Sequence, residues 1–210
     1  MITLAEQLLE EKVLKNLKNH SCPSHMYGQA GNYLQNQVEN ILGITISDGL
    51  IDIVSHGISL ELKSRREGVD SAFTIGSIHE SNIINTLDWT NSPICTKMRK
   101  ILLITTGGTE RDKDDNVVKD VKIYDFYSKP EIQDMLEQSY RHSRNQIVAN
   151  VNSNPQLVYC EYTGYLAYFE RVKVNENYTN SWKFRFAKQK FQDLLTMGNS
   201  NFNNVIEYNV

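Results

Sequence analysis

The chain has 210 residues, of which 40% are hydrophobic and 22% charged, and its formal net charge is −3. Since a chain of this length can bury one substantial core, we predict a single domain over residues 1–210. The slightly acidic balance excludes a polycation that coats nucleic acid. It is compatible with local basic patches, because phosphate contacts need a favourable field only at the groove.

The sequence also excludes a disulfide-rich or zinc-binding framework and a secreted or membrane-spanning protein. Three widely spaced cysteines form neither a paired disulfide framework nor a zinc-binding pattern: Cys22, Cys95 and Cys160. The N-terminal residues include acids where a secretory signal peptide would need a basic start, and no apolar run is long enough to span a membrane. We therefore expect a cytoplasmic protein that does not contact membranes.

Two amphipathic helices are expected before residue 45. From Thr3 to Asn19 the apolar residues recur at helical spacing, with Thr3 as the N-cap and Glu6 as the matching acid of a capping box. The second helix has a buried stripe made of Leu34, Val38, Ile41 and Leu42. Glu39 lies on a different face of this helix, where it is consistent with a plain surface acid.

Residues 48–66, DGLIDIVSHGISLELKSRR, have the pattern of a β-hairpin that carries acidic side chains. A His-Gly pair supplies the turn, and apolar residues alternate with polar ones along the second strand. Alternation places Glu61 and Lys63 on one face, and the first strand can bring Asp52 beside them. Asp48 competes with Asp52 for this place. Because Asp48 lies in a Ser-Asp-Gly sequence typical of turns, we favour Asp52 and leave the choice open.

Two carboxylates and one ammonium in this arrangement indicate phosphodiester hydrolysis. Repulsion between Asp52 and Glu61 would be relieved by a hard divalent cation such as Mg²⁺, which takes oxygen ligands and retains waters and substrate phosphate. Such an ion acidifies a bound water and neutralises charge on the phosphate, and we expect Mn²⁺ to substitute for it. Lys63 would orient the attacking water or help to deprotonate it. The competing interpretation is an edge hairpin with a solvated charged face.

The motif Asp52, then Glu61-Leu62-Lys63, resembles the PD-(D/E)XK nuclease superfamily, with Ile51 in place of the proline. Three other segments resemble its MutH-like branch of mismatch-repair nicking enzymes and related Type II restriction endonucleases. They are AGNYLQNQVENILGI before the hairpin, WTNSPICTKMRKILLI after it, and FRFAKQKFQDLL near the C-terminus. The four blocks keep the family's order over roughly residues 28–195. The resemblance implies that Glu39 joins the metal site.

Basic residues downstream of the hairpin are candidates for DNA contact. Arg65 and Arg66 follow Lys63 and could grip phosphates, although ordinary surface arginines would give the same sequence. Lys97 stands just before ILLITT, a short apolar run typical of a buried central strand. Because a cation at the mouth of such a strand would lie next to the carboxylates, we predict that Lys97 holds the scissile phosphate. A simple strand-end flank is the alternative.

The segment from Ser181 to Lys190 interleaves aromatic and basic residues. Strand alternation would bury the aromatic side chains and direct the basic ones outward. The DNA-binding candidates here are Lys183, Arg185, Lys188 and Lys190, with guanine readout possible for Arg185. A solvated strand face is the competing interpretation.

These patterns together predict an α/β protein with a restriction-endonuclease-like core, a mixed β-sheet flanked by helices. The catalytic core would span about residues 28–127, and about residues 128–196 would contribute recognition. We expect a Mg²⁺-dependent, sequence-specific endonuclease acting on double-stranded DNA, most simply a Type II restriction enzyme. The alternatives are a MutH-like repair nickase, a branched-DNA nuclease, and a catalytically silent DNA-binding protein of the same fold. The sequence leaves a monomer and a homodimer equally open.

Overall fold

The computed structural model describes residues 2–22, 30–46, 51–55, 57–67, 73–107, 117–150, 166–186 and 194–195. Its helices are α1 (Leu4–Leu17), α2 (Ala30–Leu42), α3 (Glu80–Asn85), α4 (Pro93–Lys97) and α5 (Pro130–Asn150), with a 3-10 turn η2 (Trp89–Asn91). Its strands are β1 (Ile53–Ser55), β2 (Ile58–Arg66), β3 (Phe73–His79), β4 (Lys100–Thr106), β5 (Val118–Asp125), β6 (Ala167–Val174) and β7 (Asn177–Phe186).

The first sheet has four strands in the order β1-β2-β4-β5. β1 and β2 form the predicted antiparallel hairpin, β2 and β4 are parallel, and β4 and β5 are antiparallel. The run predicted as a buried central strand is β4, which lies between β2 and β5. The prediction of a mixed sheet with flanking helices in an α/β protein is therefore confirmed.

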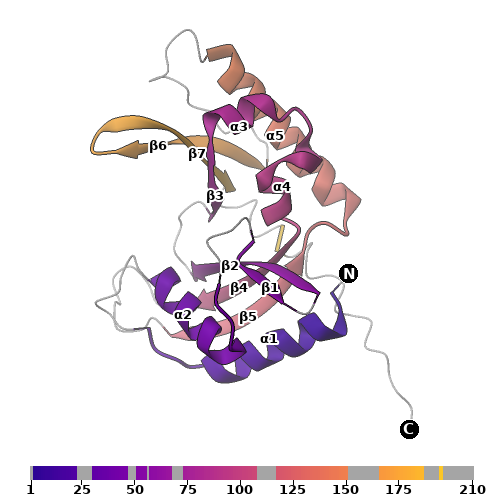
Figure 1. Ribbon diagram of the computed structural model, residues 1–210, viewed down its shortest axis with the longest axis vertical. Helices are drawn as coiled ribbons and strands as arrows, with labels where there is room; N and C mark the ends of the chain where they lie inside the picture. The colour runs from indigo at the N-terminus through magenta and orange to yellow at the C-terminus, as the bar shows by residue number, and fades with distance from the viewer. Residues whose placement is uncertain are drawn as a thin grey trace.

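A second sheet has the order β3-β7-β6, with antiparallel pairing throughout. The polar region after the hairpin has no clear strand or helix pattern, so β3 and the short helix α3 were not predicted from the sequence. The parallel pair β2 and β4 needs a long crossover between its strands, and β3, α3 and α4 lie within that crossover. Figure 1 shows the two sheets stacked along the long axis of the molecule, with α1 and α2 beside the first sheet and α3, α4 and α5 beside the second.

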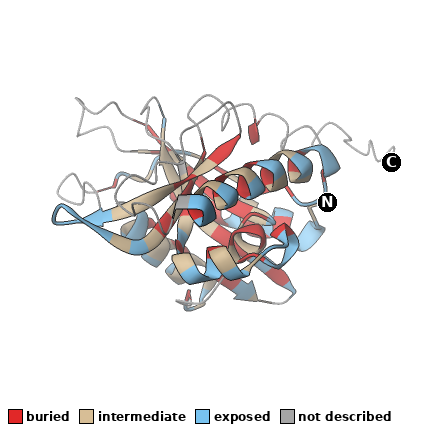
Figure 2. Ribbon diagram, turned by 90° about the horizontal axis from the view of Figure 1, so that it is seen from above, coloured by how far each residue is buried: buried red, intermediate tan, exposed pale blue. Residues whose placement is uncertain are grey.

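Two hydrophobic clusters meet at β4, because successive side chains of a strand point to opposite faces. Leu102 and Ile104 pack with residues of α1, α2 and β5 in one cluster. Ile101 and Leu103 pack with α4, α5 and the aromatic side chains of the second sheet in the other. In Figure 2 the buried residues follow the inner faces of the helices and the interior of the sheets. The side chains of β2 are divided between these two faces in the same way.

The two helices predicted before residue 45 are α1 and α2. α1 begins after Thr3, whose side chain accepts a hydrogen bond from the backbone N–H of Glu6 while the Glu6 carboxylate accepts one from Thr3. α5 begins at Pro130. Proline is favourable there because the N–H groups of the first helical turn have no acceptor within the helix, so the N–H that proline lacks costs no hydrogen bond. Of the helices described, none combines the length and the apolar composition needed to cross a membrane.

Candidate active site

Asp52, Glu61 and Lys63 meet on the face of β2 that looks toward the second sheet. Glu61 and Lys63 are two residues apart on β2, and Asp52 immediately precedes β1. Ile53 pairs with Leu60, so the antiparallel register carries Asp52 to the level of Glu61. The three side chains therefore share one face, as the hairpin pattern predicts.

Backbone and side-chain contacts fix the Asp52 carboxylate at this point. Its Oδ2 accepts a hydrogen bond of 2.8 Å from the backbone N–H of Leu62, the residue between Glu61 and Lys63. The same oxygen lies 3.9 Å from the Lys63 Nζ. Lys63 also donates a 2.5 Å hydrogen bond to the Oε1 of Glu61. One ammonium group is thus shared by two carboxylates.

Lys97 adds a second ammonium from a different element. It is the last residue of α4, and its Nζ lies 3.0 Å from the Oε1 of Glu61. The Lys97 side chain crosses Gly76 of β3 on its way, since a Cβ built on Gly76 would lie only 3.2 Å from the Lys97 Cδ. Because contacts that close are rare for real side chains, a residue without a Cβ suits this crossing. The structure brings Lys97 to the carboxylates, as predicted.

The Glu61 carboxylate is buried at the base of the cluster. Its side chain is 0% exposed, whereas those of Asp52, Lys63 and Lys97 are 21%, 22% and 18% exposed, so the cluster opens to solvent above Glu61. Burial raises the pKa of Glu61 above its ordinary 4.5, the charge of Lys63 opposes this rise, and the charge of Asp52 adds to it. The Oε2 of Glu61 is buried and accepts no hydrogen bond from any described residue.

No protein-family model matches this chain, and no curated protein matches it.

The donor set fits a hard divalent cation. Asp52 and Glu61 supply carboxylate oxygens, the ligand type preferred by Mg²⁺, and a buried polar atom such as the Glu61 Oε2 normally has a partner. Over the described ranges, no group of three or more His, Cys, Asp or Glu side chains gathers at one point. This pair alone satisfies the usual pattern for Mg²⁺, which binds one or two carboxylates and keeps several waters.

Glu39 makes a different contact from the one implied by the family resemblance. Its Oε1 accepts a 2.6 Å hydrogen bond from the backbone N–H of Ile46, and its carbonyl accepts bonds from the two residues that follow α2. The carboxylate thus fastens the end of α2 to the segment leading into the hairpin. No described hydrogen bond or ion pair joins Glu39 to the cluster, and its contribution to a metal site stays a prediction.

The two arginines that follow Lys63 point to opposite faces of β2. Arg65 continues the row formed by Glu61 and Lys63, and its charge is close enough to Tyr124 of β5 to lower the pKa of that phenol, although burial raises it to about 12 overall. Arg66 faces the side of α1 and α2. By position, only Arg65 extends the face that carries the cluster.

The strand segment from Ser181 is β7, and its alternation is as predicted. Trp182, Phe184 and Phe186 are fully buried, while Lys183 and Arg185 lie on the opposite face. Arg185 pairs closely with Glu170 of β6, which also lies opposite Lys183. The sequence did not predict this ion pair, in which Glu170 compensates the charge of Arg185 that was expected to face DNA. Three predicted residues lie outside the described part of the chain: Lys188, Lys190 and the competing ligand Asp48.

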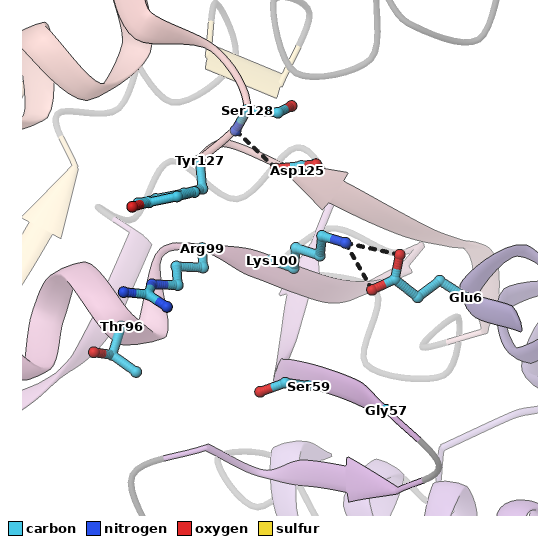
Figure 3. A pocket seen from close by; sticks show the side chains of 9 residues that line it. All are labelled: Glu6, Gly57, Ser59, Thr96, Arg99, Lys100, Asp125, Tyr127 and Ser128. Carbon is cyan, nitrogen blue, oxygen red and sulfur yellow. Dashed lines mark hydrogen bonds and ion pairs between the residues drawn. The ribbon is translucent and has the colours of Figure 1, made fainter. Parts of the chain in front are cut away.

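A cavity of about 290 Å³ lies where β4 begins and β5 ends, next to the point at which the chain leaves α4, and none of the four cluster residues lines it. Figure 3 shows how its charged groups are arranged. Lys100 donates to both carboxylate oxygens of Glu6 at 2.8 Å, and Asp125 accepts from the backbone N–H of Ser128 at 3.0 Å. Arg99 stacks over the Tyr127 ring at 4.8 Å. These internal pairings make the cavity a structural junction between α1, α4 and the first sheet.

Proposed function

We propose that this protein is a divalent-metal-dependent endonuclease that hydrolyses phosphodiester bonds in duplex DNA at a recognised sequence, and specifically a restriction endonuclease. The observation that carries the proposal is the fully buried Glu61, whose Oε2 has no hydrogen-bond partner among the described residues, with Asp52, Lys63 and Lys97 around it. Two acids and two amines at one opening toward solvent suit a reaction in which water attacks a phosphodiester and negative charge builds up on its oxygens.

Asp52 and Glu61 would hold the metal. Asp52 is positioned by the Leu62 N–H and Glu61 by its buried place on β2, so neither carboxylate needs to reorganise to bind a cation. The chemistry supplied by Mg²⁺ bound there is neutralisation of the phosphate charge and acidification of a water. Mn²⁺, which also accepts oxygen ligands, is proposed to substitute.

The two lysines have separate proposed roles. Lys63 lies between the carboxylates and is partly exposed, so its Nζ can donate a hydrogen bond that orients the attacking water. Lys97 reaches the cluster from α4, and its ammonium would pair with a non-bridging oxygen of the scissile phosphate. Lys97 would exchange its present partner, the Glu61 carboxylate, for substrate.

Support for duplex DNA as substrate comes from the residues around the cluster and from the resemblance to the MutH-like branch. Arg65 extends the same face of β2, and Lys183 lies on the outward face of the second sheet. A restriction-endonuclease-like core is part of the proposal, since the mixed sheet with the acid pair on its hairpin suits that fold. The charged face of an ordinary edge hairpin would not require a fully buried glutamate.

The test is to incubate the purified full chain with Mg²⁺ and unmethylated plasmid and phage DNA. Discrete fragments with shared end sequences are expected, and sequencing those ends defines the recognised site. Nicked circles without linear product would favour a repair nickase, and preference for junctions would favour a branched-DNA nuclease. Specific binding without cleavage under Mg²⁺ or Mn²⁺ would replace the enzyme with a silent DNA-binding protein. Sedimentation in the same buffer decides between a monomer and a homodimer.

A further inference from the structure

The hairpin of β6 and β7 extends beyond the sheet to which it belongs. β3 pairs with β7 only over residues 181–186, whereas β6 and β7 pair with each other out to Val174 and Asn177. Figure 1 shows the outer part standing away from the rest of the molecule, and every residue from 173 to 178 is exposed. We name residues 171–180 the tip ribbon.

Internal contacts hold the tip ribbon in a defined direction. The Nε of Arg171 donates to the carbonyl of Thr179 at 2.7 Å, and its Nη2 donates to the side chain of Asn180 at 3.3 Å. The Arg171 guanidinium lies 5.6 Å from the Trp182 ring, and the indole N–H of Trp182 donates to Glu80 of α3 at 3.0 Å. The ribbon is therefore anchored to the second sheet and to α3.

The turn at the end of the ribbon contains side chains where glycine would fit most easily. Asn175 and Glu176 have φ values of 46° and 68°, in the left-handed region. Asparagine tolerates this region, but glutamate is disfavoured there, and two-residue hairpin turns usually place glycine at the second position. The shape of the turn does not require a carboxylate at Glu176, and backbone strain of this kind commonly marks a functional side chain.

The chemistry of the tip suits base edges better than phosphates. From residue 173 to 178 its exposed polar side chains are those of Lys173, Asn175, Glu176, Asn177 and Tyr178, and the Asn177 amide donates to the Asn175 carbonyl at 3.3 Å. Amides pair with adenine, and a carboxylate accepts from the amino group of cytosine, while phosphates repel a carboxylate. A two-stranded β-ribbon also matches the width of the major groove of B-DNA.

We propose that the tip ribbon enters the major groove of duplex DNA and reads base edges there, with Glu176 accepting a hydrogen bond from a cytosine. This inference rests on the proposed function, because it takes duplex DNA as the substrate. Asn177 lies seven positions before Phe184, which pairs with Gly76 under the Lys97 side chain. At about 3.3 Å per residue the tip lies about 23 Å from Lys97, so the base that it reads lies within about one helical turn of the cut.

The experiment selects bound sequences from a random duplex library. Each selection uses the full chain with Lys63→Ala, so that DNA is bound but not cut. The ribbon variant is Glu176→Gly, which relieves the left-handed conformation and is expected to fold at least as stably. The matched control is Asn19→Gly, which relieves a φ of 65° after α1, far from the ribbon.

In the Glu176→Gly variant, the preference for cytosine at one position of the selected sequence should fall by about 5- to 100-fold. Its affinity for random duplex should be unchanged or higher. The control variant should select the same sequence as the parent. An unchanged selected sequence would overturn the ribbon proposal alone, as would equal weakening on every sequence or an altered oligomeric state. Failure of the parent protein to bind any duplex would overturn this proposal and the proposed function together. Specific binding by a wild-type chain that never cleaves would overturn only the nuclease assignment.

Discussion

The Nζ of Lys97 lies 3.0 Å from the Oε1 of Glu61, although 36 positions separate the two residues in the chain. Lys63, two positions from Glu61, binds the same oxygen from β2. A single buried carboxylate oxygen therefore receives two ammonium groups, one supplied locally and one supplied by α4. This convergence gives the cluster its shape.

Replacement of Lys63 by alanine should abolish cleavage and spare DNA binding. Loss of a group that positions and activates the attacking water lowers rates by about 10²- to 10⁴-fold. The measurement is single-turnover cleavage of plasmid DNA together with equilibrium binding of a duplex. Lys122→Ala is the matched control, because Lys122 also pairs with an acid two positions earlier on a strand, Asp120 at 3.3 Å. If both variants lost cleavage activity to a similar extent, Lys63 would have no specific role in catalysis.

Gly76→Ala tests the route by which Lys97 reaches the cluster. The added Cβ would lie 3.2 Å from the Lys97 Cδ, so the lysine must shift by a few tenths of an ångström. We expect cleavage to slow by about 10-fold, since small misplacements of catalytic groups are costly. Unfolding free energy should change by no more than about 1 kcal/mol, because alanine is tolerated in a strand.

The control for that variant is Ser77→Ala, at the next position on β3, where the side chain is exposed. Lys97→Ala should lower cleavage further than Gly76→Ala, by about 10²- to 10³-fold, since it removes the charge itself. If Lys97→Ala cleaved at the wild-type rate, Lys97 would be only a flank of β4.

Metal binding should depend on pH through Glu61. Its pKa is raised by burial from the ordinary 4.5, so in the metal-free fold this carboxyl takes up a proton earlier than in the unfolded chain as pH falls. Its contribution to metal-free stability is complete below 4.5 and is lost as pH rises through the raised value. Protons and Mg²⁺ compete for the carboxylate, so the increase in Tm caused by Mg²⁺ should shrink as the medium is acidified toward 4.5.

Thermal melts with and without Mg²⁺ measure this dependence without any cleavage assay. At neutral pH the metal should add about 2.7 kcal/mol when present at a hundred times its Kd. Glu61→Gln should remove that increase at every pH, while Asp120→Asn, on the exposed side of β5, should leave it intact. A Glu61→Gln variant that Mg²⁺ stabilised as well as wild type would rule out Glu61 as a ligand.

Glu39→Gln separates the two roles open to Glu39. Glutamine keeps an oxygen that can accept the hydrogen bond from Ile46, so the variant should melt like wild type, whereas Glu39→Ala should lose about 1.5–3 kcal/mol of unfolding free energy. If the charge of Glu39 assists the metal, Glu39→Gln should cleave more slowly and need more Mg²⁺. An unchanged Mg²⁺ dependence would leave Glu39 with its structural role at the end of α2 alone.

Local periodicity carried much of the prediction. The alternation of polar and apolar residues along β2 places Glu61 and Lys63 on one face, and a hairpin of that register brings Asp52 to them. The capping box formed by Thr3 and Glu6 likewise predicts the start of α1. Each of these relationships spans few residues and is fixed by the strand period of two or the helix period of 3.6, so they can be derived from sequence alone.

Tertiary structure decided what periodicity leaves open. The packing of β3 against α4 lets the Lys97 side chain pass over Gly76. The pairing of β6 with β7 gives Arg185 a carboxylate partner, Glu170. The segment after α2 supplies the backbone N–H of Ile46, which donates to Glu39. These contacts join segments far apart in sequence, and the energy that selects them comes from burial and pairing across the whole fold. The pattern of about ten neighbouring residues therefore cannot predict which distant segments will pair or pack with them.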